Sequence, residues 1–306
     1  AYIPPTIAGV VLAYRKKYLL GGIITALFIA LQIQSNHIQM SYYFMFVILF
    51  FVGAYFEDAY KKKELPHFFK ASAILALAAV VGVCINISNL YHTYEYSKET
   101  MRGKSELKQE GAAASQTSSG LDRDYITNWS IGETLTLLVP NVKGGGSGST
   151  MSQSEAAMAK ANPMYSGIYS QFPRQYFGEQ PWTAGPVYVG AFVMFLFVLG
   201  CFIVKGPLKW ALLGATIFSI LLSWGKNFMG LTDFFIDYVP MYNKFRAVSS
   251  ILVIAEFTIP LLAIFALKEI LSKPDTLKLK ENRGGVIATL VLTAGVALIL
   301  SLIHIS

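Results

Sequence analysis

The chain has 306 residues, of which 54% are hydrophobic and only 14% are charged. Soluble domains carry about 25% charged residues, so the composition argues against a soluble globular protein. The net charge of +7 does not indicate nucleic acid as a partner, because the positive charges stand in short clusters between apolar runs, as in membrane proteins. The sequence opens with Ala1 in a short apolar run and shows no signal peptide, so we expect both ends to be cut from a longer protein.

Eight apolar runs approach the length of about 20 residues that a helix needs to cross a bilayer. They predict an all-α fold, a polytopic bundle of about eight transmembrane helices whose first span is incomplete. The predicted spans cover residues 2–14, 18–34, 40–56, 69–90, 186–204, 208–224, 247–267 and 285–303. The predicted parts are transmembrane helices at 1–90, a loop domain at 91–185 and transmembrane helices at 186–306.

The loops between these spans differ in charge. The odd loops are basic, whereas the second loop, around His37, has no Lys or Arg. Under the positive-inside rule the basic loops face the cytoplasm, which predicts a multi-pass membrane protein with residues 91–185 on the outer side. The sixth loop also contains cations, which weakens the contrast. The basic residues of the odd loops are Arg15, Lys16, Lys17, Lys61, Lys62, Lys63, Lys70, Lys205, Lys209, Lys268, Lys273, Lys278, Lys280 and Arg283.

The fourth loop is long enough to form a mostly helical and irregular domain of its own. Its start, through Glu95 and Lys98, is predicted to continue the preceding helix. The stretch Ser130-Ile-Gly-Glu133 fits a capping box, in which the serine and glutamate side chains bond each other's backbone at a helix start. The run Gly144-Gly-Gly-Ser-Gly-Ser149 is typical of a flexible loop.

Glu256 is the most unusual residue within a predicted span. It lies nine positions into the seventh span, about 14 Å deep at 1.5 Å per residue. A carboxylate is costly there and usually faces the bundle interior or a wet cavity, so we predict that Glu256 faces the bundle. Pro260 is predicted to kink the helix. Two roles stay open for Glu256, a hydrogen bond to a neighbouring helix or a functional charge.

Polar residues near the predicted outer ends are candidate ligand contacts. Lys226 and Arg246 lie in the sixth loop, and an arginine there could bind a lipid phosphate with two or more hydrogen bonds. The alternative for Arg246 is an ordinary interfacial anchor. His37 and Gln39 stand in the uncharged second loop, where they could contact a substrate or serve the structure.

The outer loop adds carboxylates and aromatic rings. Glu179 stands close to Trp182 at the predicted membrane edge, a combination compatible with sugar binding, while Glu133 could simply cap its helix. No metal, nucleotide or nucleophile motif is present: the four histidines lack ligand spacing, and the glycines at 144–146 lack the phosphate-binding form. Cys84 and Cys201 lie in apolar runs and are expected to act as small hydrophobic side chains.

Several motifs of the chain are familiar as a set. They are Asn36-His-Ile-Gln39, Asp124-Tyr-Ile-Thr-Asn-Trp-Ser130, Tyr176-Phe-Gly-Glu-Gln-Pro-Trp182, Gly225-Lys-Asn227 and Pro240 to Arg246. These motifs resemble the YfhO-like family of bacterial membrane proteins, in the style of its Bacteroidetes members. The resemblance runs through nearly the whole chain, which would be a central piece of a longer member. One position departs from the family pattern, because Arg246 is followed by Ala-Val-Ser-Ser250 without the expected phenylalanine or proline.

The resemblance implies a GT-C-type enzyme of the bacterial cytoplasmic membrane. Such an enzyme takes a sugar from a polyprenyl-phosphate carrier and transfers it, on the outer side, to an envelope polymer or lipid. The key acidic residue of the family would lie before Ala1. A divalent cation stays open as a cofactor, with no motif for it here. The family's loop positions correspond to His37, Gln39, Glu133, Glu179, Lys226 and Arg246.

Two other function classes stay open at the level of sequence. A transporter or flippase of envelope lipids or glycans is favoured by Glu256 and a kinked seventh span, although no inverted repeat is visible. A non-catalytic envelope assembly protein would use the outer loop to bind a partner. A large ordered loop over a membrane-level cavity would favour the glycosyltransferase.

Overall fold

A computed structural model describes residues 2–99, 127–148, 158–159, 162–165, 167–168, 176–245 and 247–305. Within these ranges the regular structure is helical, and the only β-type pairing is an isolated bridge between Gly144 and Tyr176. The all-α fold predicted from the sequence is therefore confirmed for the described part of the chain.

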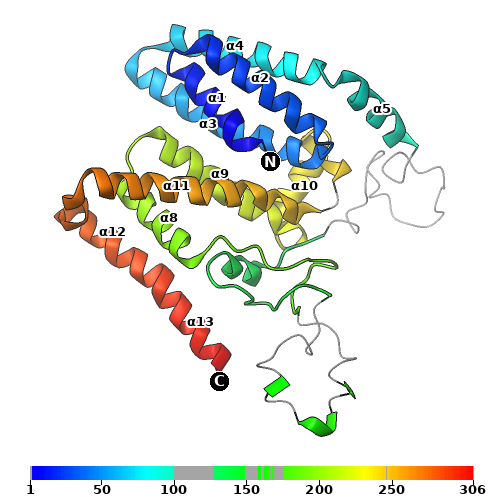
Figure 1. The fold of residues 1–306 in the computed structure, drawn as a ribbon, viewed down its shortest axis with the longest axis vertical. Helices are drawn as coiled ribbons and strands as arrows, with labels where there is room; N and C mark the ends of the chain where they lie inside the picture. Colours follow the sequence, from blue (N-terminus) through cyan, green and yellow to red (C-terminus); the bar gives the residue numbers. More distant parts are fainter. Residues whose placement is uncertain are drawn as a thin grey trace.

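The first four helices form one layer of the bundle, at the top of Figure 1. The first two approach closely because both carry glycine at the contact: a Cβ on Gly21 would lie 2.5 Å from the backbone nitrogen of Ala13. Such small-residue contacts are typical of membrane helices. The elements are α1 (Ile3–Tyr14), α2 (Tyr18–Gln34), α3 (Ile38–Lys62), α4 (Leu65–Cys84) and α5 (Ile87–Lys98), which extends away from the layer.

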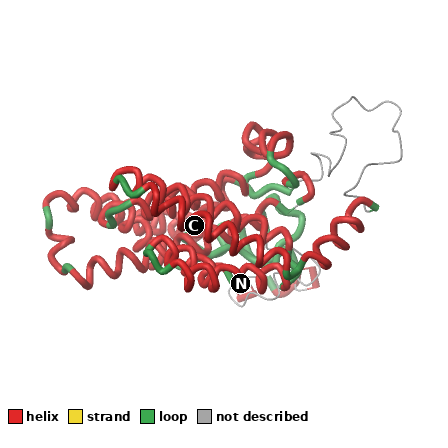
Figure 2. The backbone as a smooth tube through the Cα atoms, turned by 90° about the horizontal axis from the view of Figure 1, so that it is seen from above, coloured by secondary structure: helices red, strands yellow, loops and turns green. Residues whose placement is uncertain are grey.

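The second half of the chain forms the other layer, with α11 in contact with both α8 and α9. Figure 2 shows the helices of the bundle running side by side. Helix α12 packs against α8, and in Figure 1 α13 extends away from the rest. The elements are α8 (Ala191–Ile203), α9 (Pro207–Ser223), η5 (Gly225–Phe228), α10 (Met229–Tyr238), η6 (Tyr242–Lys244), η7 (Val248–Leu252), α11 (Val253–Ser272), η8 (Pro274–Lys278), α12 (Lys280–Leu290), the π-helical η9 (Val291–Gly295) and α13 (Val296–Ile305). Short 3-10 helices at η2 (Ile131–Leu137) and η4 (Pro163–Tyr165) lie in the loop between the two layers.

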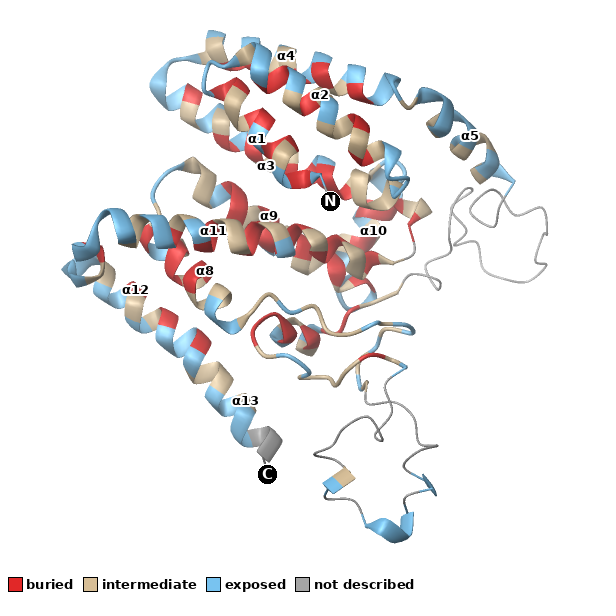
Figure 3. Cartoon of the chain, in the orientation of Figure 1, coloured by how far each residue is buried: buried red, intermediate tan, exposed pale blue. Residues whose placement is uncertain are grey.

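The main hydrophobic core joins the two layers through α3. Fully buried side chains such as Val47 on α3, Leu212 on α9 and Ile259 on α11 belong to one cluster. Figure 3 shows buried positions concentrated along α9 and α11, whereas α5 has no buried residue. The bundle therefore packs around α3, α9 and α11.

Among the described residues, four helices are long and apolar enough to cross a membrane, or five spans if α9 and the bent segment after it count as one. That pair bends by 112° at Trp224. Helices α1, α2 and α8 are apolar but shorter, with 10–17 residues each. The chain thus has the helices of an integral membrane protein, while the count of eight spans stays a prediction. The four helical spans are Ile38–Lys62, Leu65–Cys84, Val248–Ser272 and Lys280–Leu302.

Some boundaries differ from the sequence expectation. The predicted span 69–90 begins earlier, at Leu65, and ends at Cys84, after which α5 starts as a separate helix. The predicted span 186–204 becomes helical only at Ala191, because Gly190, the N-cap residue, has a positive φ of 100° that is not helical. The charged continuation predicted through Lys98 is confirmed by α5.

The prediction that Glu256 faces the bundle interior is wrong. Its side chain is exposed and makes no hydrogen bond or ion pair to a described residue. The reason is helical phase: Ala255, Ile259 and Leu262 are buried on one face of α11, and Glu256 falls outside that face. The helix continues through Pro260 to Ser272.

The four basic loops lie at one end of the bundle. Lys16 in the first loop pairs with Glu64 in the third loop at 3.2 Å, and Lys205 in the fifth loop approaches Glu281 in the seventh loop at 3.7 Å. A cavity lined by both Arg15 and Pro207 brings the first and fifth loops together. This shared end is what the positive-inside rule requires of cytoplasmic loops.

We expect cysteines introduced at Ser118 and at Lys62 to be labelled from opposite sides of the membrane. The background should carry Cys84→Ala and Cys201→Ala, since both native thiols are free. A membrane-impermeant maleimide applied to intact cells should label the cysteine at position 118, and the one at position 62 only after permeabilisation. Labelling of position 118 only after permeabilisation would invert the predicted topology.

Candidate functional site at the loop end of the bundle

The loop segment 127–148 is anchored to the end of α9 opposite the basic loops. Trp129 is 1% exposed; its backbone N–H donates to the carbonyl of Ser223 at 3.2 Å, and its carbonyl accepts from Asn227 Nδ2 at 3.0 Å. The indole of Trp224 donates to Thr134 Oγ1 at 3.0 Å. These bonds hold the loop on the turn that joins α9 to α10.

Glu133 links the two described halves of the loop. It is 2% exposed and completes the predicted capping box: its Oε2 accepts from the backbone N–H of Ser130 at 2.8 Å. Its Oε1 accepts from the Tyr176 hydroxyl at 2.6 Å and from Gln180 Nε2 at 3.4 Å. Burial, and then this bond to Glu133, raises the pKa of Tyr176. The capping role of Glu133 is confirmed. Glu133 also holds the side chain of Gln180 through the bond to its Nε2.

A cavity of about 310 Å³ opens between the loop and the helix ends. Gln39 on α3 forms part of its floor and donates from Nε2 to the carbonyl of Ala247 at 2.7 Å and to the Tyr43 hydroxyl at 3.0 Å. The Oε1 of Gln39 has no hydrogen bond to a described residue. The lining of the cavity includes amide, hydroxyl and aromatic groups. The lining residues are Gln39, Thr127, Gln180, Pro181, Trp182, Ala247 and Ser249.

Glu179 stands beside this cavity but is directed to two asparagines. Its Oε2 accepts from Asn227 Nδ2 at 2.7 Å, and Asn128 Nδ2 donates to the same oxygen. The side chain of Glu179 is exposed. The bond between Glu179 and Asn227 therefore joins the motif Tyr176–Trp182 to the turn of the sixth loop. Lys226 lies on this turn, directly before Asn227.

The structure unites some of the residues that the sequence singled out. Gln39 and Trp182 line the same cavity, although Trp182 is 77% exposed at its rim. His37 is exposed at the start of α3 and does not line it. Lys226 is exposed on the turn beside Asn227. Arg246 lies outside the described residues, so its position relative to Lys226 stays untested.

Three polar lining residues were not predicted: Thr127, Gln180 and Ser249. The first two stand inside the motifs quoted for the family resemblance, and Ser249 stands in the stretch that departs from it. Membership of these motifs could therefore have pointed to Thr127 and Gln180. The motifs do not indicate, however, which of their side chains line one cavity.

No group of three His, Cys, Asp or Glu side chains that could hold a metal ion occurs in the described part of the chain. Comparisons with protein-family models, with curated proteins and with solved structures find no match to this chain. The fold and the cavity define a helical protein with membrane-length apolar helices and a polar pocket beneath an ordered loop. The family resemblance stays a prediction.

We expect Gly225→Ala to destabilise the loop end of the bundle. Gly225 has a φ of 51°, and a Cβ there would lie 2.6 Å from the carbonyl oxygen of Thr127. The left-handed conformation alone costs a non-glycine residue about 1–2 kcal/mol. The matched control is Gly230→Ala on α10, where a Cβ meets nothing within 4 Å and alanine favours the helix. Thermal unfolding in detergent should show a lower Tm for the first variant only; equal Tm values would contradict the anchoring role of this turn.

Proposed function

We propose that this protein is part of a GT-C-like enzyme that transfers a sugar from a polyprenyl-phosphate carrier to a cell-envelope acceptor. The observation that supports the proposal most is the cavity between the outer loop and the ends of α3 and η7. Its volume of about 310 Å³ lies within the range of small-molecule sites, about 300–1,000 Å³. A lipid-linked sugar needs such a place, where its tail stays in the bilayer and its sugar reaches an aqueous pocket.

The lining of the cavity suits a sugar. Its polar side chains in the described residues are amides and hydroxyls, Gln39, Thr127, Gln180 and Ser249, which can donate to and accept from sugar hydroxyls. Trp182 offers a ring at the rim. The proposal assigns the carrier phosphate to the sixth-loop cations Lys226 and Arg246, because a guanidinium binds phosphate with paired hydrogen bonds.

The transporter alternative has less support in the structure than in the sequence. It rested mainly on Glu256 as a bundle-facing charge, and Glu256 is exposed on α11. An assembly protein without catalysis would bind neither the carrier nor its sugar in the cavity, so ligand binding separates it from the proposed enzyme.

We expect Trp182→Ala to weaken binding of undecaprenyl-phosphate hexose about tenfold, since one aromatic contact supplies on the order of 1.4 kcal/mol. Binding of bare undecaprenyl phosphate should change little. The matched control is Phe177→Ala, because Phe177 lies on the same loop and is 76% exposed but does not line the cavity. Native mass spectrometry in detergent measures both ligands. Equal effects of the two variants would remove Trp182 from the site.

We expect Arg246→Ala to reduce sugar transfer in cells while leaving the abundance of the protein unchanged. The reason is loss of the cation that the proposal assigns to the carrier phosphate. Arg246→Lys should recover part of the transfer, because the charge remains without the fork of donors. If transfer and abundance fall in proportion, Arg246 serves folding instead, and the phosphate site is wrong.

A further inference from the structure

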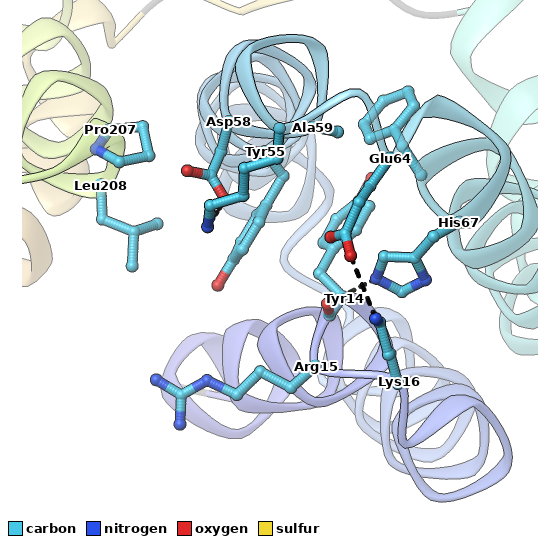
Figure 4. Close-up of a pocket in the computed structure, with 12 residues that line it drawn as sticks. Tyr14, Arg15, Lys16, Tyr55, Asp58, Ala59, Glu64, His67, Pro207 and Leu208 are labelled. Atoms are coloured by element: carbon cyan, nitrogen blue, oxygen red, sulfur yellow. Dashed lines mark hydrogen bonds and ion pairs between the residues drawn. The ribbon is translucent and has the colours of Figure 1, made fainter.

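A second cavity lies at the other end of the bundle, where the basic loops meet. It has a volume of about 510 Å³ and is formed by α1, α3, α4 and the start of α9 (Figure 4). Helix α3 connects the two sites, with Gln39 near its first turn and Asp58 near its last. This second cavity is separate from the site of the proposed function.

Stacked rings make the wall of this cavity apolar. The Tyr14 ring stacks on Tyr55 at a centroid distance of 4.4 Å and on Phe68 at 5.5 Å. Pro207 and Leu208 face them from α9 (Figure 4). His67 adds no free donor, because its Nε2 donates to the Tyr14 carbonyl at 2.8 Å and its Nδ1 is bonded to the Tyr18 hydroxyl at 2.6 Å.

Two of the three cations that line the cavity form ion pairs with its carboxylates. Lys16 pairs with Glu64 at 3.2 Å, and Lys62 pairs with Asp58 at 2.6 Å. Arg15 makes no hydrogen bond or ion pair to a described residue. Figure 4 shows Lys16 directed to Glu64, whereas Arg15 extends away from that pair toward the side of Leu208. The cavity therefore offers a guanidinium with all its donors free, on an apolar wall.

A groove continues from this cavity between α3 and α9. Its first part is lined by Glu57, Asp58 and Lys61 beside Pro207 and Trp210, and its further part, toward Phe46, is mainly apolar. A cavity of about 300 Å³ shares Asp58 and Pro207 with the first, and another of about 450 Å³ shares Glu57, Pro207 and Trp210 with the second. The groove reaches Phe46, eleven residues before Glu57. That is about 16 Å along a helix, or about half of the 30 Å hydrocarbon core of a bilayer.

We propose that this end of the bundle binds an anionic phospholipid of the cytoplasmic leaflet. The Arg15 guanidinium holds the lipid phosphate through paired hydrogen bonds, and an acyl chain lies in the groove between α3 and α9. Basic pockets between helices on the cytoplasmic side are suited to such headgroups. The length of the groove, about one leaflet, favours a lipid over a free phosphate ion. The side of the membrane follows from the basic loops and does not depend on the sugar-transfer proposal.

The test measures lipid binding to the purified full chain in detergent by native mass spectrometry. The probes are phosphatidylglycerol, phosphatidylcholine and the soluble headgroup glycerol 3-phosphate. We expect phosphatidylglycerol to bind at least about tenfold more tightly than phosphatidylcholine. Arg15→Gln should abolish that preference, and Arg15→Lys should keep part of it. The matched control is Lys17→Gln, which removes one positive charge from an exposed residue of the same loop that does not line the cavity.

A second variant tests the groove without changing a charge. Gly53 lines it, and a Cβ there would meet nothing within 4 Å, so Gly53→Leu should fill the groove while α3 still folds. It should weaken phosphatidylglycerol binding severalfold and leave the Tm of the lipid-free protein unchanged.

Three results would overturn the proposal. Equal binding of the two phospholipids by the unmodified chain would remove the headgroup preference. Equal losses in Arg15→Gln and Lys17→Gln would show diffuse attraction by the basic loop. Displacement of phosphatidylglycerol by millimolar glycerol 3-phosphate, with Gly53→Leu unaffected, would show a site for free phosphate compounds.

Discussion

The carboxylate of Glu133 holds together the cavity-forming part of the loop between α5 and α8. A buried carboxylate is costly unless it is hydrogen-bonded, and this one accepts from the Ser130 backbone, the Tyr176 hydroxyl and the Gln180 amide. Tyr176 in turn accepts from the backbone N–H of Gln180 at 2.9 Å. Gln180 thus has both its backbone and its side chain fixed by groups that converge on Glu133. The cavity wall that Gln180 forms depends on this single buried charge.

Helix α3 gives that wall a fixed floor. Near its outer end, Gln39 donates to the carbonyl of Ala247, and the Tyr42 hydroxyl donates to the carbonyl of Pro240 at 2.9 Å. Both acceptors lie in the irregular chain between α10 and α11. Near its inner end, α3 supplies Asp58 and Lys62 to the basic cavity. One long helix therefore relates two sites of different chemistry, and its core contacts with α9 keep them at a constant separation.

The sequence predicted the helical class, the shared end of the basic loops and the capping box at Ser130, because each follows from local composition or spacing. It did not predict α10, since Thr232, Phe235 and Ile236 bury a short face within a loop that reads as polar. It also misplaced Glu256, because a hydrophobic segment does not show which helix face meets a neighbour. It did not identify Thr127, Gln180 and Ser249 as residues that line one cavity, because their meeting depends on long-range packing that a motif cannot show.

The polar side chains that line the cavity beneath the loop in the described residues are uncharged, and Lys226 of the sixth loop is not among the lining residues. Glu179 does not line this cavity, and its Oε2 accepts from Asn128 and Asn227. Sugar hydroxyls in the cavity would therefore meet amides and hydroxyls. Such a division suits a ligand with a neutral polar group and a separate anionic group. The cavity at the basic loops combines the Arg15 guanidinium with a groove that becomes apolar toward Phe46. This combination suits a different ligand, one in which a charged group is joined to a hydrocarbon chain.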